Sequence, residues 1–344
     1  MALSKIQTNS ITDGNITTAK IADTAVHGYR NLVINGAMQV AQRGNRSPTG
    51  FTGPFYAGPD RWLVNRTGTG STGFSQISST SYGATNAAQA TFESAAGESY
   101  IVTQRIESAN VAHLAGQNVT LSFWISGSTT AGSTSLNAGL SYANSVDDFE
   151  YETVISSNSV SYTSSAQKFT FNFTLPSNAV NGIAVRFEGI QADAIGTFTL
   201  TFGGVQLEVG SEATPFEHRP FSATLQECRR YYQLVYQRGN STTGTYYSYY
   251  NKFYGNQVQF EPMRTGPTTS YSHVSGAFYW VNPGVQSYSA NSTTGFSYGA
   301  SQPNAFSMGS IEFNQTRQSG GAGPSDFSSY RLEANLIFHL DAEL

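Results

Sequence analysis

Charged residues are scarce in this chain, making up 12% of its 344 residues, against roughly 25% in an average soluble protein. The 18 Lys and Arg residues, set against 22 Asp and Glu, leave a net charge of −4 and form no basic run. Duplex nucleic acid binds proteins through basic patches, so it is not expected as the main partner. The single cysteine, Cys228, excludes an intrachain disulfide framework and a zinc site built on cysteines.

Long apolar runs are also missing. None approaches the ~18 residues that a membrane-spanning helix needs, so we expect no membrane insertion. The first residues start no apolar segment of a signal peptide, which predicts synthesis in the cytoplasm without secretion. Yet 39% of the residues are hydrophobic and 13% are aromatic, which is enough to build folded cores. The abundance of aromatic residues and the 34 glycines predict β structure with many turns.

Residues 1–28 carry an apolar side chain at every fifth position: Ile6, Ile11, Ile16, Ile21 and Val26. This period fits neither a strand nor a helix. Such a spaced row cannot form a core alone, but identical chains could bury their rows against one another. We therefore expect an arm that oligomerises or attaches the protein; the alternative is a flexible arm with accidental spacing.

Residues 29–220 contain several segments in which apolar and polar residues alternate: 118–125, 169–175, 183–187 and 198–202. Gly203 and Gly204 interrupt the last run before alternation resumes. Alternation with period two is typical of half-buried strands. Several such strands with turn residues between them predict a β-sandwich or barrel.

Residues 221–344 are expected to begin with one short helix near 223–235 and to continue as a second, C-terminal β domain. Helical spacing joins Leu225, Cys228, Tyr232 and Val235. Ser222 or Thr224 could cap this helix. Cys228 is expected to be a small buried side chain rather than a nucleophile.

Motifs for catalysis or cofactor binding are weak. The stretch 68–73 matches G-x-G-x-x-G, but no helix start follows it, so we expect a loop. The acidic residues of 147–152 are interpreted as a solvated edge. The five histidines are scattered, and no nucleophile elbow is present. We therefore expect a protein that is not an enzyme and has no cofactor, metal or catalytic residue.

Aromatic residues are dense in the C-terminal region. Seven of them are candidates for stacking on sugar rings: Tyr246, Tyr247, Tyr249, Tyr250, Tyr254, Tyr279 and Trp280. The alternative is that aromatic residues of the strands fill cores and faces. For Trp62 and Trp124 we favour this alternative.

Several segments in order resemble a jelly-roll module of bacteriophage tail-fibre or adhesin virion proteins. They are NLVINGAMQV (31–40), QRG (42–44), DRW (60–62), QRIE (104–107), LAGQNVTLSFW (114–124), GVQLEVGS (204–211), ATPFE (213–217) and ECRRYY (227–232). The closing run, 204–217, also resembles carbohydrate-binding jelly rolls. Residues 14–23 are similar to the short-period N-terminal segments of phage fibres.

This resemblance implies an all-β virion structural protein with a jelly-roll β-sandwich at 29–220. It implies a homotrimer whose arm, 1–28, docks onto other virion proteins, and a place on the tail. The function we expect is attachment of the particle to a host-surface glycan by a tail fibre or receptor-binding protein. The alternative is a capsid decoration (cement) protein that forms trimers on the head. A depolymerase that cuts host glycan is a third class.

Overall fold

A computed structural model describes most of the chain. The described residues are 29–49, 53–68, 70–94, 98–130, 135–191, 196–237, 245–247, 252–261, 263–265, 268–275, 278–282, 285–290, 296–300, 309–316, 330–332 and 335–344. The chain divides into two compact units, Met1–Thr224 and Leu225–Leu344. Within the described ranges, no helix has the length and apolar character needed to cross a membrane.

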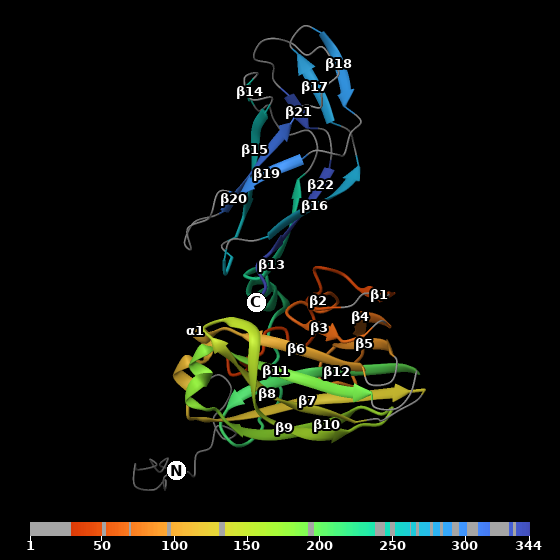
Figure 1. Cartoon of the computed structure of the whole chain (residues 1–344), viewed down its shortest axis with the longest axis vertical. Coiled ribbons are helices and arrows are strands. Elements are labelled where there is room, and N and C mark those ends of the chain that lie inside the picture. Colours follow the sequence, from red (N-terminus) through yellow and green to blue (C-terminus); the bar gives the residue numbers. More distant parts are fainter. Residues whose placement is uncertain are drawn as a thin grey trace, which may run out of the picture. The chain divides into compact units, whose positions relative to one another are not determined.

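Two antiparallel sheets of six strands form the first unit (Figure 1). Sheet A has the order β1 (Arg46–Thr49), β4 (Ser71–Ser78), β5 (Asn86–Ser94), β12 (Gly196–Val209), β7 (Asn118–Thr129), β10 (Gln167–Thr174). Sheet B has the order β2 (Phe55–Tyr56), β3 (Leu63–Arg66), β6 (Glu98–Ile106), β11 (Ile183–Gln191), β8 (Ser135–Ser145), β9 (Asp148–Ser161). The short helices α1 (Ser108–Val111), η4 (Ala112–Leu114) and η5 (Ser177–Asn181) lie in connections.

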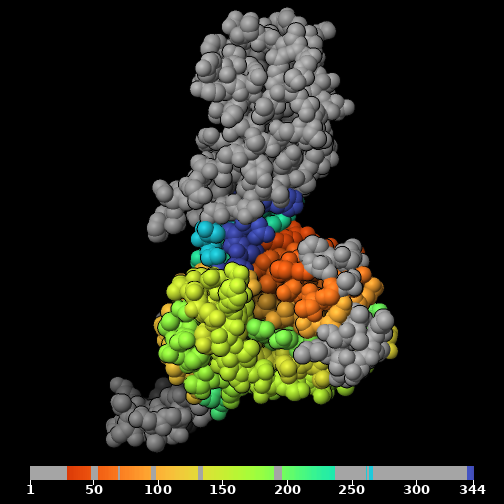
Figure 2. Space-filling view, in the orientation of Figure 1, coloured from red at the N-terminus to blue at the C-terminus, as the bar shows by residue number. Residues whose placement is uncertain are grey.

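The chain crosses between the sheets repeatedly, at β1 to β2, β3 to β4, β5 to β6, β6 to β7, β7 to β8, β9 to β10, β10 to β11 and β11 to β12. These crossings give the β-sandwich of jelly-roll type that the sequence predicts. In the space-filling view, the early strands β2 and β3 (orange) and the strands β8 and β9 (yellow-green) lie on two sides of the visible face (Figure 2). That placement agrees with their positions at opposite ends of sheet B.

Alternation in the sequence produces these strands. In β7 the apolar set is fully buried between the sheets: Val119, Leu121, Phe123 and Ile125. The other three alternating segments lie in β10, β11 and β12, so all four predicted strands are confirmed. Gly203 and Gly204 fall where the register between β12 and β7 shifts, which explains the interruption in the alternating pattern.

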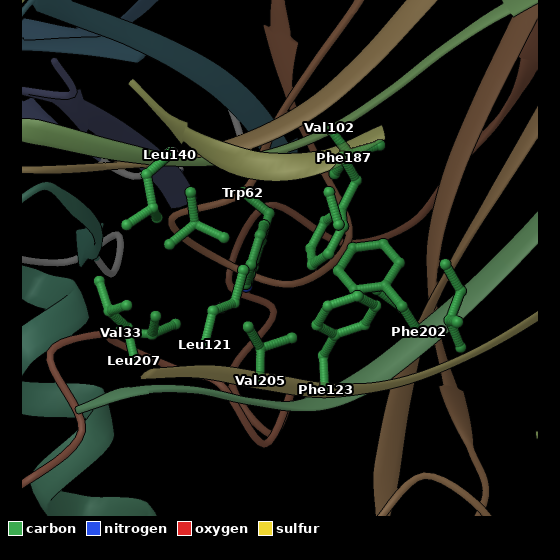
Figure 3. Close-up of a cluster of buried hydrophobic side chains, with 14 of the residues drawn as sticks. Val33, Trp62, Val102, Leu121, Phe123, Leu140, Phe187, Phe202, Val205 and Leu207 are labelled. Atoms are coloured by element: carbon green, nitrogen blue, oxygen red, sulfur yellow. The ribbon is translucent and has the colours of Figure 1, made fainter. Parts of the chain in front are cut away.

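The interior of the sandwich is built around Trp62, which is fully buried (Figure 3). Its ring meets Phe202 edge-on, with 5.2 Å between ring centroids, and stacks on Phe187 at 6.1 Å. Phe187 in turn meets Phe123 at 4.8 Å. These rings come from both sheets, so they join the two layers, and the expectation that Trp62 serves packing is confirmed.

The opening and closing segments of the jelly roll are hydrogen-bonded to each other. The Asn31 side chain donates to the carbonyl oxygen of Val205 at 2.9 Å and accepts from the backbone N–H of Leu207 at 3.0 Å. The Glu217 carboxylate accepts from the backbone N–H of Asn31 at 3.1 Å. Much of the resemblance to phage modules rests on these two segments, and here their polar side chains hold the fold together.

The second unit is also formed from antiparallel strands, in three sheets. Their orders are β13 (Tyr232–Gln237), β22 (Asn335–Asp341), β16 (Thr268–Ser275); β14 (Thr245–Tyr247), β15 (Lys252–Phe260), β20 (Gly309–Thr316), β19 (Phe296–Ala300); and β18 (Val285–Ala290), β17 (Phe278–Asn282), β21 (Tyr330–Leu332). The described strands thus agree with the all-β fold class expected for this region.

One helix, α2 (Phe221–Arg229), forms where a helix was expected but ends earlier. Tyr232 and Val235, which fit helical spacing, instead lie in β13 and pair with β22. The helix start also differs, because the carbonyl oxygen of Pro220 accepts from the N–H groups of Ala223 and Thr224. Cys228 is buried, as expected.

Candidate functional site

The predicted glycan-binding aromatics lie in two different sheets of the second unit. Tyr246 and Tyr247 are in β14 and Tyr254 is in β15, where Tyr254 pairs with Thr245. Tyr279 and Trp280 are in β17, in another sheet. Tyr249, Tyr250 and the arm residues Ile6, Ile11, Ile16, Ile21 and Val26 lie outside the described residues. A common site for the seven aromatics therefore stays a prediction.

Trp124 occupies a different kind of position from Trp62. Its neighbours in β7, Phe123 and Ile125, are fully buried between the sheets, whereas Trp124 is partly exposed on the outer face of sheet A. Trp124 therefore lies on a strand face rather than in the core. Alternation along β7 turns every second side chain away from the interior.

The loop 79–85 holds the indole of Trp124 in place. The Tyr82 and Ser126 hydroxyl oxygens are hydrogen-bonded at 2.6 Å, which fixes the loop onto β7. A Cβ at Gly83 would lie 2.8 Å from Nε1 of Trp124, and one at Gly204 would lie 3.1 Å from its Cδ1. Both glycines have positive φ, +73° and +54°. Only glycine combines this backbone with so close an approach, so the ring is preorganised.

Another segment, 209–217, covers the same side of β7 further along the strand. The Thr120 hydroxyl donates to the carbonyl oxygen of Gly210 at 2.7 Å. The Glu208 carboxylate accepts from the N–H and hydroxyl of Thr214, at 2.8 and 2.6 Å. Trp124 thus lies between two covered stretches of one strand.

Polar side chains surround this ring on the sheet. Cross-strand pairing places Lys168 of β10 opposite Trp124, and Ser122 opposite Thr170. On the other side, Thr201 of β12 is opposite Ser126. Residues directly opposite in an antiparallel pair share a face. Ser122, Ser126 and Thr201 are buried, whereas Lys168 and Thr170 are exposed beside the ring. We call the accessible set the Trp124 face: Trp124, Lys168 and Thr170. It combines a flat ring with one hydroxyl group and one ammonium group.

The outer face of sheet B has a network of ion pairs. Glu152 lies 3.6 Å from Nε of Arg105 and 3.1 Å from Nη1 of Arg186, whose Nη2 is 3.0 Å from Glu188. The Ser141 hydroxyl donates to Glu152 at 2.6 Å. The Glu152 side chain is only 11% exposed. For Glu152 the interpretation of 147–152 as a solvated edge was therefore wrong, because β6, β8 and β11 of the same sheet supply its partners.

The G-x-G-x-x-G stretch is confirmed as a loop and the start of β4. It closes over a buried ion pair, Arg66 with Glu98, at 2.7 Å. A Cβ at Gly68 would collide with the Glu98 side chain, and one at Gly70 would lie 1.6 Å from the carbonyl oxygen of Glu93. These glycines make room for the ion pair.

Two buried tyrosines have shifted ionisation in the interior. Burial raises the pKa of Tyr100 and that of Tyr162 well above the ordinary value of 10.0. The Tyr100 ring packs on Phe92 with centroids 4.6 Å apart. Both groups stay neutral and belong to the core. Among the described residues, no three His, Cys, Asp or Glu side chains gather into a possible metal site.

Similar solved structures include carbohydrate-binding modules and a phage tailspike domain. The enzymatically active domain of tailspike protein 4 from bacteriophage CBA120 is 13% identical, with a TM-score of 0.36, over 52% of this chain and 21% of that chain. The N-terminal cellulose-binding domain of Cellulomonas fimi β-1,4-glucanase C is 17% identical, with a TM-score of 0.27, over 41% and 90%. The C-terminal family 22 carbohydrate-binding module of Clostridium thermocellum Xyn10B is 16% identical, with a TM-score of 0.31, over 44% and 87%. No protein-family model matches the chain, and no curated protein matches it.

Proposed function

We propose that the sandwich is a glycan-binding module and that the Trp124 face is its binding site. The observation that carries this proposal is the outward indole of Trp124, held rigid by Gly83 and Gly204. A fixed aromatic ring offers apolar area to the C–H face of a sugar at little cost in conformational entropy. The exposed hydroxyl of Thr170 can exchange hydrogen bonds with sugar hydroxyls. The role is binding without turnover.

For the whole chain we propose a virion structural protein of the tail that attaches the particle to host-surface glycan. The support is the ordered resemblance of the jelly-roll segments and of the arm to phage fibre proteins. In this proposal three chains assemble through the arm, and the arm also docks onto other virion proteins. Several linked weak sites raise avidity by roughly 10²–10⁴ without any new contact.

The site is tested by glycan binding to the full-length protein and to Trp124→Ala. An array of bacterial surface oligosaccharides would identify the ligand, and titration calorimetry would measure its affinity. We expect Trp124→Ala to weaken binding at least about 10-fold, since losing a central aromatic contact costs on the order of 1–2 kcal/mol.

The matched control is Tyr151→Ala, which removes a 67% exposed aromatic ring from β9 of the other sheet. We expect this variant to bind like the unmodified protein. Equal affinity for the Trp124→Ala and Tyr151→Ala variants, both folded by circular dichroism, would reject the Trp124 face as the site.

The place on the particle needs a separate test. Intact virions labelled with antibody to this protein and imaged by negative-stain electron microscopy should carry label on the tail. Label spread over the head would instead favour the capsid decoration alternative, with the arm as a clamp on the capsid.

A further inference from the structure

The Trp124 face carries an isolated positive charge. Lys168 is the only lysine in residues 29–224, in a chain with a net charge of −4. It lies directly opposite Trp124 in the register of β10 with β7, and it is exposed. Residues opposite one another in an antiparallel pair have Cβ atoms roughly 4.5–5.5 Å apart. The ammonium group is therefore attached beside the indole, on the same side of the sheet.

No carboxylate of the described residues forms an ion pair with Lys168. The arginines of the opposite face, Arg105 and Arg186, both form ion pairs with Glu152, and Arg186 also with Glu188. A lysine ammonium is a compact, mobile point charge that can pair with a single anionic group. Lys168 is thus free to meet a charge that a ligand brings.

The carboxylates on the outward side of sheet A do not compete for this lysine. Glu208 is buried, and its oxygens are already hydrogen-bonded to Thr214. Glu93 pairs with Thr197, whose carbonyl oxygen accepts from the N–H of Thr130. Thr130 is six residues from Trp124 along the chain, which at the rise of a strand places the level of Glu93 roughly 20 Å from the ring. An anionic ligand at the ring would therefore meet attraction without nearby repulsion.

We propose that the Trp124 face selects a glycan that carries carboxylate groups, such as a polymer of uronic or sialic acid. This inference rests on the proposed function and names its ligand class. The indole stacks on the ring of one sugar while the Lys168 ammonium pairs with the carboxylate of that sugar or of its neighbour. Charge on the ligand then adds selectivity to contacts that otherwise fit many sugars.

A structural role for Lys168 makes a different prediction. β10 is the edge strand of sheet A, and lysines on edge strands prevent pairing with other chains. If this were the whole role, replacing Lys168 would cause self-association and leave glycan affinity unchanged.

The experiment compares acidic oligosaccharides with their neutral counterparts, for example oligoglucuronate with oligoglucoside and oligogalacturonate with oligogalactoside. The full-length protein is titrated by calorimetry and by tryptophan fluorescence at 50 and 500 mM NaCl. We expect at least one acidic member to bind about 10-fold more tightly than its neutral partner. Most of this preference should vanish at the higher salt concentration, because exposed charges are screened there.

Variants separate the contributions. Lys168→Gln should weaken binding of the acidic oligosaccharide about 5- to 10-fold and leave binding of the neutral one unchanged. Lys168→Arg should retain most of the preference. Arg43→Gln makes the same change in net charge elsewhere on the sandwich and should have no effect on either ligand. Trp124→Phe should remove the fluorescence change on binding.

Two results would overturn the inference, and they differ in what they say of the proposed function. A neutral glycan bound through Trp124, with no response to Lys168→Gln or to salt, would reject the acidic ligand and leave the glycan-binding site standing. Failure of the unmodified protein to bind any acidic or neutral member would reject both. Self-association of Lys168→Gln with unchanged affinity would assign Lys168 to edge protection.

Discussion

The two outward faces of the sandwich differ in whether their charged side chains are paired within the protein. On sheet B, Arg105 and Arg186 converge on Glu152, and Glu188 completes the chain of ion pairs. On sheet A, Lys168 has no carboxylate partner in the described part of the chain. Charges that are matched within the protein contribute to its stability and specificity of folding, whereas an unmatched charge beside a fixed ring is available to a ligand.

The two faces also differ in how far other segments of the chain cover them. The loop 79–85 and the segment 209–217 both fold over sheet A; the loop reaches the edge of the Trp124 ring at Gly83, and the segment meets β7 at Thr120. The interior below is shared by both faces. The comparison therefore predicts that changes in the interior, on the sheet B face and on the sheet A face differ in size, in that order.

The largest effect is expected in the interior, from Trp62→Ala. This variant removes the ring between Phe187 and Phe202 and leaves a cavity that the two sheets can close only in part. We expect the free energy of unfolding to fall by about 3–5 kcal/mol, measured by urea denaturation. A loss no larger than that caused by Trp124→Ala would contradict the distinction between interior and face.

Alkaline pH should also act on the interior before either face. Below pH 10, tyrosines are protonated in both the folded and the unfolded chain, so they add no pH dependence. Above pH 10 the unfolded chain loses protons from Tyr100 and Tyr162, whereas burial keeps both protonated in the fold. Stability should then fall by up to about 1.4 kcal/mol per buried tyrosine per pH unit.

Urea titrations between pH 9 and 11 would measure this loss. The double variant Tyr100→Phe, Tyr162→Phe should flatten the pH dependence. The control Tyr151→Phe, at an exposed position of sheet B, should leave it unchanged. An equal response to both changes would place the alkaline sensitivity outside the interior.

The strands could be predicted because each one shows its own alternating pattern, as in segment 118–125. The end of α2 could not be predicted in this way. Tyr232 and Val235 suit a helix by spacing, and only pairing with β22, about a hundred residues later, makes them a strand. In the same way, the sequence around Trp124 shows that it alternates with buried residues. Which strand faces are covered, however, depends on loops from other parts of the chain.

The sheet B network shows the same limit for charged residues. Glu152 belongs to an acidic run that looks solvated along the sequence, and its arginine partners come from β6 and β11. Nothing near Glu152 in the sequence indicates them. Local sequence patterns thus predicted the strands, whereas the side-chain partners on both outer faces could be found only from the tertiary structure.

A smaller effect is expected on the sheet B face, from Glu152→Ala. It leaves Arg105 without the ion pair described above and Arg186 with Glu188 alone. Because these groups are partly exposed, we expect a loss of about 1–3 kcal/mol in the free energy of unfolding. Glu150→Ala, two residues away at an exposed position, is the matched control and should change stability by less than about 0.5 kcal/mol.

The smallest effect is expected on the sheet A face. Trp124→Ala removes a partly exposed ring that touches the chain near Gly83 and Gly204. We expect a loss of about 1 kcal/mol, or a fall of roughly 2–4 °C in the thermal midpoint. If scanning calorimetry instead gave a loss as large as that of Glu152→Ala, the ring would serve to stabilise the fold. A small loss of stability joined to a large loss of glycan affinity is the combination that a face built for a ligand requires.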